Sequence, residues 1–343
     1  MHRQLEIQSA VIETVLNMHE VPARVTGGTV TPRCVRFQVL PAVGTAAQIE
    51  QLSEDMELAF NTPCRIARRG AAFDVEIPRS NPEIVQLIPL CRQLVLEEIP
   101  PVTAVLGLAD DGTPLLIRLP SPDVSHVLVA GTTGAGKTVL LQTIILSLAL
   151  LNQPGEMRIL LLDPKGSAFP HFAGLPHLSR PVIREAGEAE EALESLVRLM
   201  GTRANIRRQG PHVVVVIDDL ANLLMWGDAL QGSLTGLLQR GREASIHIVA
   251  ATQEPTLPLV RPLMEANFPV RLVGRVTNAT SARLATGRNG TGAERLEGRG
   301  DFVVVAEGQV TRFQAAYVEP NELRGHSCPV LENKVNPVSI GVR

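Results

Sequence analysis

Residues 127–138 read VLVAGTTGAGKT, a short apolar run followed by a glycine-rich stretch. The apolar part is typical of a strand that is buried on both faces, and the rest fits the pattern GxxxxGK[ST] at every fixed position. Glycines let the backbone curl so that successive N–H groups point at phosphate oxygens, and a helix that starts at the loop adds its positive end. We therefore predict an ATP-binding loop of eight residues: Gly131, Thr132, Thr133, Gly134, Ala135, Gly136, Lys137 and Thr138.

The last two residues of this loop carry distinct chemistry. Lys137 is expected to reach the β- and γ-phosphates as a compact point charge, and the Thr138 hydroxyl to ligate Mg²⁺. The chain has 32 lysines and arginines, of which only Lys137, Lys165 and Lys334 are lysines. A lysine at position 137 of such an arginine-rich chain therefore supports a phosphate-binding role for the loop.

A second apolar run, residues 213–217, ends in two carboxylates. An ATPase with a phosphate loop needs a carboxylate at such a strand end to hold Mg²⁺, which suits Asp218. A neighbouring carboxylate polarises the attacking water, which suits Asp219. Taken alone, the pair could equally be an acidic turn that caps the strand. Many ATPases of this kind carry glutamate where Asp219 stands, and a loss of reach of ~1 Å can matter about 10²-fold in rate.

Two further strand ends carry polar residues. The run 246–251 is followed by Thr252 and Gln253, and we predict that the Gln253 amide senses the γ-phosphate or orients water. The run 159–162 is followed by Asp163-Pro164-Lys165-Gly166. Open α/β sheets bind ligands at the carboxyl ends of their strands. Proline and glycine also form turns for their own reasons, so both interpretations of this segment stay open.

The order of apolar runs predicts an α/β fold for residues 101–320. Strand-like runs lie at 127–130, 159–162, 213–217, 246–251 and 302–305, and helical stretches such as 188–203 lie between them. Strands that alternate with helices predict a mainly parallel, doubly wound sheet.

Residues 1–100 are predicted to form a separate small α/β domain. Helical segments at 4–19 and 46–60 alternate with strand-like runs at 35–40 and 73–77, and Pro100-Pro101 makes the expected boundary. Residues 321–343 are expected to be a C-terminal tail.

Composition excludes several classes of protein. The net charge of −3 excludes a uniformly basic nucleic-acid binder. The most apolar stretch, residues 139–151, is shorter than the ~20 residues that a membrane-spanning helix needs. The start of the chain has no signal-peptide pattern, and its scattered cysteines indicate neither a zinc site nor a disulfide framework. We therefore expect a reduced, cytoplasmic protein.

Longer segments around these motifs resemble a known family. They are HVLVAGTTGAGKTVLL at 126–141, LLLDPKG at 160–166, VVVVIDDLANLLM at 213–225, REASIHIVAATQEP at 242–255 and GAERLEGRGDF at 292–302. Together they resemble the FtsK/SpoIIIE DNA translocases over roughly residues 27–320, with a first domain similar to that family's α domain. The resemblance implies a RecA-like P-loop motor that hydrolyses ATP with Mg²⁺ and assembles as a hexameric ring around double-stranded DNA.

The resemblance also implies that ATP lies between subunits and that an arginine from the neighbour completes the site. Arg271, Arg275 and Arg283 are candidates for that arginine or for DNA contact. We expect Arg271 and Arg283 to be catalytic, together with Lys137 and Asp219.

The chain departs from the family pattern at basic positions. Glu254, Glu265 and Ala279 stand where the family usually has cations. Duplex DNA is bound mainly through its phosphates, so other arginines would have to hold it. The arginines available for this are Arg240, Arg242, Arg261 and Arg288.

Other readings of the chain follow from what the sequence lacks. No membrane-spanning segment or C-terminal winged-helix module is found, which favours a stand-alone translocase. Alternatives are a conjugation or secretion motor of the same superfamily, and a nucleotide-gated ring that hydrolyses little.

Overall fold

The computed structural model describes residues 2–80, 82–95, 98–206, 210–319 and 322. It divides into two compact units. The small unit comprises residues 1–84 with 110–112, and the large unit comprises residues 85–109 and 113–343. Among the helices that the structure describes, none is long and apolar enough to cross a lipid bilayer.

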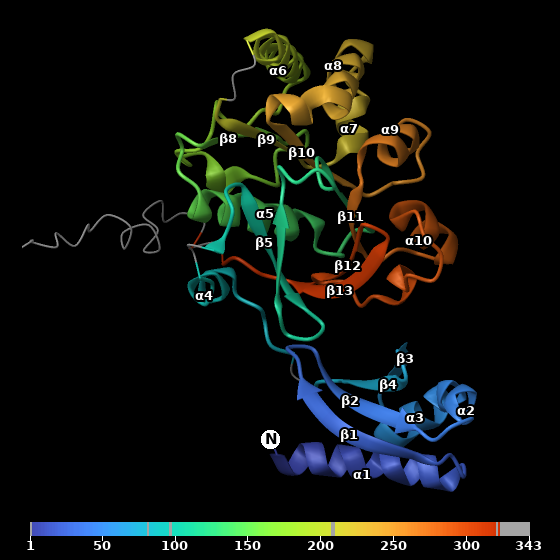
Figure 1. Ribbon diagram of the computed structural model, residues 1–343. Helices are drawn as coiled ribbons and strands as arrows, with labels where there is room; N and C mark the ends of the chain where they lie inside the picture. Colours follow the sequence, from blue (N-terminus) through green and yellow to red (C-terminus); the bar gives the residue numbers. More distant parts are fainter. Residues whose placement is uncertain (1, 81, 96–97, 207–209, 320–321, 323–343) are drawn as a thin grey trace, which may run out of the picture. The chain divides into compact units, whose positions relative to one another are not determined.

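The small unit is an antiparallel sheet covered by helices (Figure 1). Its strands follow the order β1-β2-β4-β3. Its elements are α1 (His2–Met18), β1 (Ala23–Val30), β2 (Cys34–Pro41), α2 (Ala46–Gln51), α3 (Ser53–Phe60), β3 (Arg65–Arg69) and β4 (Ala72–Pro78). Phe37 and Phe73 on the two central strands pack with Ile12 and Leu16 of α1 and with Met56 of α3, all fully or nearly fully buried. The helix and strands expected at 4–19, 35–40 and 73–77 are confirmed.

Two features of the small unit differ from the sequence prediction. The helix expected over 46–60 is two helices, α2 and α3, because the backbone leaves helical geometry at Leu52 (φ −81°, ψ 10°). The edge strands β1 and β3 were missed because most of their residues are exposed or half-buried and show no buried run.

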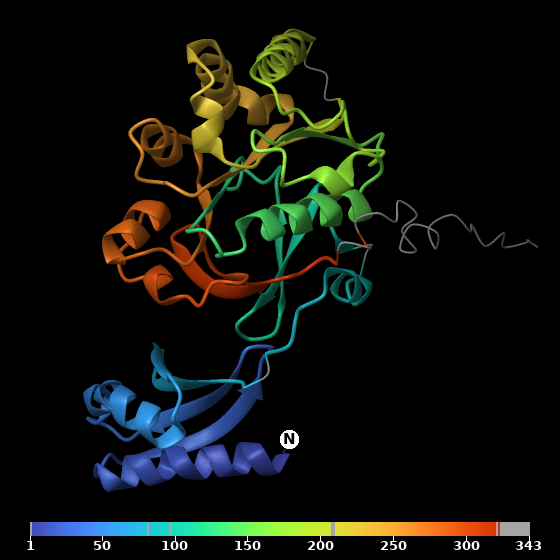
Figure 2. The same cartoon turned by 180° about the vertical axis from the view of Figure 1, so that it is seen from behind.

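The large unit is a sheet sandwiched between helices (Figures 1 and 2). Within the described residues the sheet has nine strands in the order β6-β5-β13-β12-β11-β7-β10-β9-β8. The strands are β5 (Thr103–Ala109), β6 (Pro114–Arg118), β7 (Val127–Ala130), β8 (Met157–Leu162), β9 (His212–Ile217), β10 (Ile246–Thr252), β11 (Val270–Gly274), β12 (Asp301–Ala306) and β13 (Gln309–Ala315). The helices are α4 (Leu87–Arg92), α5 (Lys137–Leu151), α6 (Ala186–Ile206), α7 (Leu220–Leu224), α8 (Asp228–Arg240), α9 (Val260–Asn267) and α10 (Ala279–Thr286).

Alternate residues of the central strands supply two hydrophobic cores. Val127 and Val129 of β7 belong to the core that contains α5, whereas Leu128 and Ala130 belong to the core built with α6 to α10. Successive side chains of a strand point to opposite faces, so a strand covered on both sides must be apolar throughout. This explains the continuous apolar runs and confirms the α/β class.

The parallel part of the sheet is smaller than predicted. Strands β11, β7, β10, β9 and β8 pair in parallel. The remaining pairings, from β11 through β12, β13 and β5 to β6, are antiparallel. The pairs β5–β6 and β12–β13 are hairpins with no helix between their strands, so they lack the strand–helix alternation that indicated a parallel sheet. Strands β11 and β12 are antiparallel although α10 lies between them.

The boundary between the units lies earlier than Pro100. The chain divides after Ile84, and residues 85–109 belong to the large unit. Leu87, Leu90 and Cys91 are buried in the core that contains α5, and the Leu87 N–H donates to the Tyr317 carbonyl at 3.0 Å. The segment before the two prolines is therefore held by the large unit.

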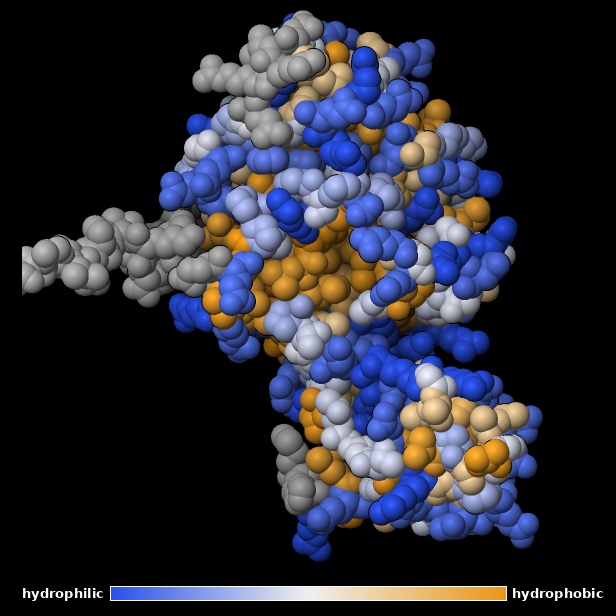
Figure 3. Space-filling model, in the orientation of Figure 1, coloured by the Kyte–Doolittle hydropathy of each residue, from blue (hydrophilic) through white to orange (hydrophobic). Residues whose placement is uncertain are grey.

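Apolar side chains also gather on a part of the large unit where no helix covers them (Figure 3). A hollow of about 290 Å³ lies there, lined largely by residues of β6, β12 and β13. Leu106, Leu115, Leu116, Ile117 and Val304 are among its lining residues.

Strand β13 approaches β5 closely at Gly107, so a substitution there tests the antiparallel half of the sheet. A Cβ at this position would collide with the Gln314 carbonyl oxygen and lie 2.8 Å from the Ala316 nitrogen, with φ at +153°. We expect Gly107→Ala to lower the free energy of unfolding by roughly 3 kcal/mol, measured by urea unfolding followed through the fluorescence of Trp226. Gly155→Ala is the control, because a Cβ at Gly155 meets nothing within 4 Å. Equal effects of the two substitutions would contradict the packing at Gly107.

Candidate nucleotide-binding site

The loop after β7 has the backbone geometry that its glycines predict. Gly131, Gly134 and Gly136 have φ values of +148°, +82° and +102°, a region that other residues rarely adopt. Gly136 is the N-cap of α5, and a Cβ there would lie 2.8 Å from the Gly300 nitrogen. The loop thus curls at the start of a helix, where N–H groups and the helix dipole favour anions.

Two neighbouring segments hold the loop in place. The backbone N–H and the hydroxyl of Thr132 donate to the Arg275 carbonyl at 2.8 and 3.0 Å. The N–H groups of Arg299 and Gly300 donate to the carbonyls of Gly134 and Ala135 at 3.1 and 2.9 Å. The loop is therefore supported both from the end of β11 and from the turn before β12.

Residues 298–300 were not predicted to belong to the site. Gly298, Arg299 and Gly300 all have positive φ, and a Cβ at Gly298 would lie 3.1 Å from the Gly134 carbonyl oxygen. The glycines that flank Arg299 just before a predicted strand were the available signal, because they indicate a turn in which backbones approach closely.

Lys137 is folded back onto its own loop. Its Nζ donates to the Thr132 carbonyl at 2.9 Å, and the side chain is buried. Burial lowers the pKa of Lys137, while the nearby carboxylates of Asp218 and Asp219 oppose that shift. A desolvated ammonium with few hydrogen-bond partners gains most from a phosphate oxygen.

Thr138 and Asp218 meet although they lie far apart in the sequence. The Thr138 hydroxyl donates to Asp218 Oδ1 at 3.2 Å. Burial raises the pKa of Asp218, the carboxylates of Asp163 and Asp219 raise it further, and the Thr138 hydrogen bond opposes the shift. This concentration of buried negative charge favours a nearby cation.

The oxygens around Asp218 fit a magnesium ion bound with phosphate. Mg²⁺ held with a nucleotide needs only one or two protein oxygens in addition to phosphates and waters, and Thr138 Oγ1 and Asp218 Oδ1 supply two. Asp163 Oδ1 is buried without a hydrogen-bond partner in the described part of the chain, which suits a water of a hydrated ion. No cluster of three or more His, Cys, Asp or Glu that could hold an ion by itself exists among the described residues.

Asp219 follows Asp218 directly and has a left-handed backbone conformation. Its φ is +72°, and it caps the N-terminus of α7. Asp219 Oδ2 accepts from Lys165 Nζ at 2.6 Å and from Asn222 Nδ2 at 2.8 Å. The carboxylate predicted to polarise water is therefore engaged with a cation and an amide.

Gln253 completes the arrangement from the end of β10. Its Oε1 accepts from the Thr133 hydroxyl at 2.9 Å. Strand β10 lies between β7 and β9 in parallel register, so the ends of these strands stand side by side. The structure thus brings the predicted loop, Asp218, Asp219 and Gln253 to one edge of the sheet.

Comparisons with known proteins agree with this arrangement. The FtsK/SpoIIIE family model matches residues 97–210. The DNA translocase FtsK of Staphylococcus epidermidis (strain ATCC 35984) is 29% identical over 359 residues, which cover 94% of this chain and 44% of the relative. The DNA translocase SftA of Bacillus subtilis (strain 168) is 31% identical over 349 residues, which cover 93% of this chain and 36% of the relative. Residues 97–210 thus match the FtsK/SpoIIIE family model, and most of the chain is similar to DNA translocases of this kind.

The match to these FtsK/SpoIIIE relatives is partial in one respect. The chain spans less than half the length of the curated relatives named above. Among solved structures, the pCW3 conjugation coupling protein TcpA, a monomer form with ATPγS, has a TM-score of 0.62 at 19% identity, over 92% of this chain and 98% of that one. This likeness shows a shared fold.

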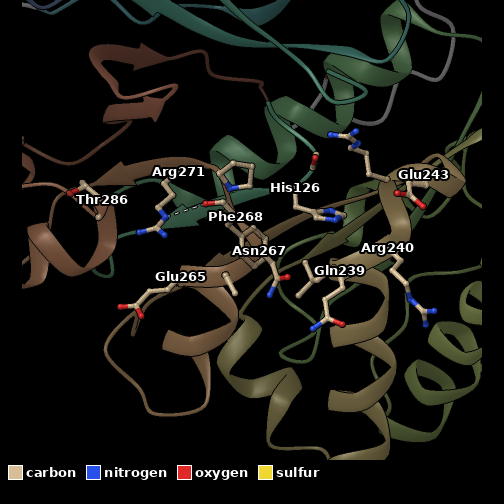
Figure 4. Close-up of a pocket in the computed structure, with 15 residues that line it drawn as sticks. His126, Gln239, Arg240, Glu243, Glu265, Asn267, Phe268, Arg271 and Thr286 are labelled. Atoms are coloured by element: carbon tan, nitrogen blue, oxygen red, sulfur yellow. Dashed lines mark hydrogen bonds between the residues drawn. The ribbon is translucent and has the colours of Figure 1, made fainter. Parts of the chain in front are cut away.

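The arginines suggested by the FtsK/SpoIIIE resemblance lie in different places. Arg271 is near the start of β11, where its guanidinium donates to the Phe268 carbonyl at 3.2 Å (Figure 4). It also donates to the Met264 carbonyl at 3.2 Å. Burial lowers its pKa. Arg275 follows β11 beside the loop and Arg283 lies on α10, both exposed. Within the chain, Arg271 stabilises neighbouring backbone at the edge of the sheet opposite to the phosphate loop. Sequence spacing alone could not reveal these contacts.

A cavity of about 650 Å³ also lies at that opposite edge (Figure 4). It is lined by residues that precede β7 and β11, among them His126 and Pro269, and by residues at the end of α8 and just after it. None of its lining residues belongs to the phosphate loop. The cavity is therefore separate from the candidate nucleotide site.

Asp218→Asn tests the electrostatics of the site. Because folding raises the pKa of Asp218, the ionised carboxylate costs stability near neutral pH, and this cost disappears as the pH falls through the raised pKa. We expect Asp218→Asn to raise the free energy of unfolding of the nucleotide-free protein at pH 7, with a gain that shrinks toward acid pH. Mg²⁺-dependent ATP binding should weaken at least about tenfold.

The control for this substitution is Asp219→Asn. It removes the ion pair with Lys165, whose side chain is 42% exposed, and should change the stability that urea unfolding measures only a little. A loss of stability in Asp218→Asn at pH 7 would contradict the predicted electrostatic cost.

Proposed function

We propose that the protein couples ATP hydrolysis to movement along double-stranded DNA. The observation that carries this proposal is the assembly of the phosphate loop, Asp218, Asp219 and Gln253 at one sheet edge in a chain whose residues 97–210 match the FtsK/SpoIIIE family model. Relatives that cover nearly the whole chain are named DNA translocases, which supports duplex DNA as the partner. ATP and DNA as substrates also favour a cytoplasmic location.

Each residue of the site has a part in the proposed hydrolysis. The loop N–H groups and Lys137 would bind the β- and γ-phosphates, and Thr138 and Asp218 would hold Mg²⁺, which neutralises charge on the transferring phosphoryl group. Asp219 would accept a hydrogen bond from the attacking water. Gln253, already tied to Thr133 of the loop, would relay the state of the γ-phosphate to β10.

A ring of subunits is the proposed working form, with a hexamer expected from the family. The apolar hollow lined largely by β6, β12 and β13 supports self-association, because apolar side chains that gather at a surface hollow suit contact with another protein surface. Arg283 is the proposed arginine that reaches the neighbour's ATP, since it is exposed whereas Arg271 is held by its own chain.

The proposed DNA contacts rest on exposed arginines outside the family's usual positions. Arg240, Arg242 and Arg288 are exposed. Arg261 is paired with Glu265 at 2.8 Å, so it contributes less free positive charge than the sequence alone indicates.

The acidic side chains favour a second candidate. Glu254 and Glu265 are exposed where the family usually carries cations, which would suit a conjugation or secretion motor that moves single-stranded DNA or protein. A weakly hydrolysing nucleotide-gated ring is the other alternative, because Asp219 is engaged by Lys165 and Asn222.

ATPase assays with and without duplex DNA separate these functions. We expect duplex DNA to raise the rate of the wild-type protein several-fold, and Lys137→Ala to reduce both rates by about 10² or more because it removes the principal phosphate cation. Stimulation by single-stranded DNA alone would favour the conjugation motor. A wild-type rate equal to that of Lys137→Ala would favour the passive ring.

Mixing two inactive variants tests Arg283 as a residue that acts on the neighbouring subunit. Arg283→Ala alone should lose about 10³-fold in rate. In a one-to-one mixture with Lys137→Ala, about a quarter of the interfaces of a head-to-tail ring combine an intact loop with an intact arginine, so activity should return. An equally inactive mixture would contradict action between subunits. Arg198→Ala, which removes an exposed cation of α6, serves as the control for a general loss of cations.

A further inference from the structure

Lys165 is a cation of the site to which the proposed hydrolysis assigns no role. It lies in the turn after β8, and β8 pairs in parallel with β9, the strand that ends at Asp218. Its Nζ lies 2.6 Å from Asp219 Oδ2. The second lysine of the chain thus contacts the carboxylate that is expected to polarise water.

This ion pair engages the Asp219 carboxylate. The same Oδ2 accepts from Lys165 and from Asn222 Nδ2, and the Asp219 side chain is only 8% exposed. Both acceptor positions of Oδ2 are therefore used, so this oxygen has none left for a water. While Lys165 stays in this position, Asp219 is poorly placed to orient water through Oδ2.

Lys165 is nevertheless held loosely. Its side chain is 42% exposed, and ion pairs with an exposed member contribute little to stability. Its charge also reaches into the site, since it lowers the pKa of Lys137 and opposes the rise in the pKa of Asp218. A competing anion near Lys137 could therefore draw Lys165 away from Asp219 at small cost.

We propose that Lys165 is a switch between Asp219 and the γ-phosphate of ATP. In the empty or ADP-bound site it neutralises Asp219, and when ATP binds its ammonium moves to the γ-phosphate oxygens. Asp219 then keeps its hydrogen bond from Asn222 and becomes free to orient water. ADP lacks the γ-phosphate and leaves the pair intact. This inference rests on the proposed function, because it concerns the same site.

The switch predicts a specific loss of discrimination between nucleotides. Calorimetric titration with Mg²⁺ and either ATPγS or ADP should show that Lys165→Met weakens ATPγS binding about tenfold or more, while ADP affinity changes little, because a charge-assisted bond to the γ-phosphate is lost. Lys165→Arg should restore part of the preference. Arg184→Met is the matched control, a cation whose side chain lies beside Gly166 of the same turn.

A purely structural role for Lys165 gives a different result. If Lys165 only braces Asp219, Lys165→Met weakens both nucleotides equally or neither, and either result overturns the proposal. If the unpaired buried carboxylate prevents Lys165→Met from folding, the double variant Lys165→Met with Asp219→Asn is compared with Asp219→Asn alone, and the same selective loss for ATPγS is expected.

The titration contains no DNA, so it is separate from the test of the proposed function. If duplex DNA does not stimulate the ATPase rate but Lys165→Met selectively weakens ATPγS binding, the translocase function is contradicted and the Lys165 switch is supported. If duplex DNA stimulates the rate but Lys165→Met leaves the nucleotide preference unchanged, the translocase function is supported and the switch is contradicted.

Discussion

The parallel pairing of β7, β10 and β9 is the constraint on which the site depends. Val249 of β10 lies opposite both Val127 of β7 and Val216 of β9, so the ends of three strands coincide at one edge. The segments that leave these ends carry the phosphate loop, the acidic pair and Gln253. A shift of one residue in either pairing would turn Thr252 and its neighbours to the other face of the sheet, and the bond between Thr133 and Gln253 would be lost.

The same edge concentrates charge that the rest of the unit cannot neutralise. Asp163, Asp218 and Asp219 are buried there, and Lys137 and Lys165 are the cations that face them. Buried like charges are costly unless cations balance them. A nucleotide with its metal ion would add both signs of charge in one step, which is a physical reason for this cluster of charges to bind it.

Much of this arrangement follows from local pattern, and the rest depends on which strands are neighbours. The loop, the strand at 213–217 and its two carboxylates could be predicted because each is a continuous run with a local physical meaning. The contact of Lys165 with Asp219 could not, since it requires β8 and β9 to be adjacent. The contacts of the Arg271 guanidinium with backbone carbonyls could not be predicted either, since they depend on the fold. The two hairpins of the antiparallel half, β5–β6 and β12–β13, lack the strand–helix alternation that identified the parallel half.

A crystal structure of the protein with ATPγS and Mg²⁺ tests the central claim most directly, namely that the carboxyl edge of β7, β9 and β10 is the nucleotide site. The account predicts phosphates enclosed by residues 131–138, with the metal ion ligated by Thr138 and Asp218. Nucleotide bound in the arginine-containing cavity at the opposite edge, with the loop empty, would contradict it.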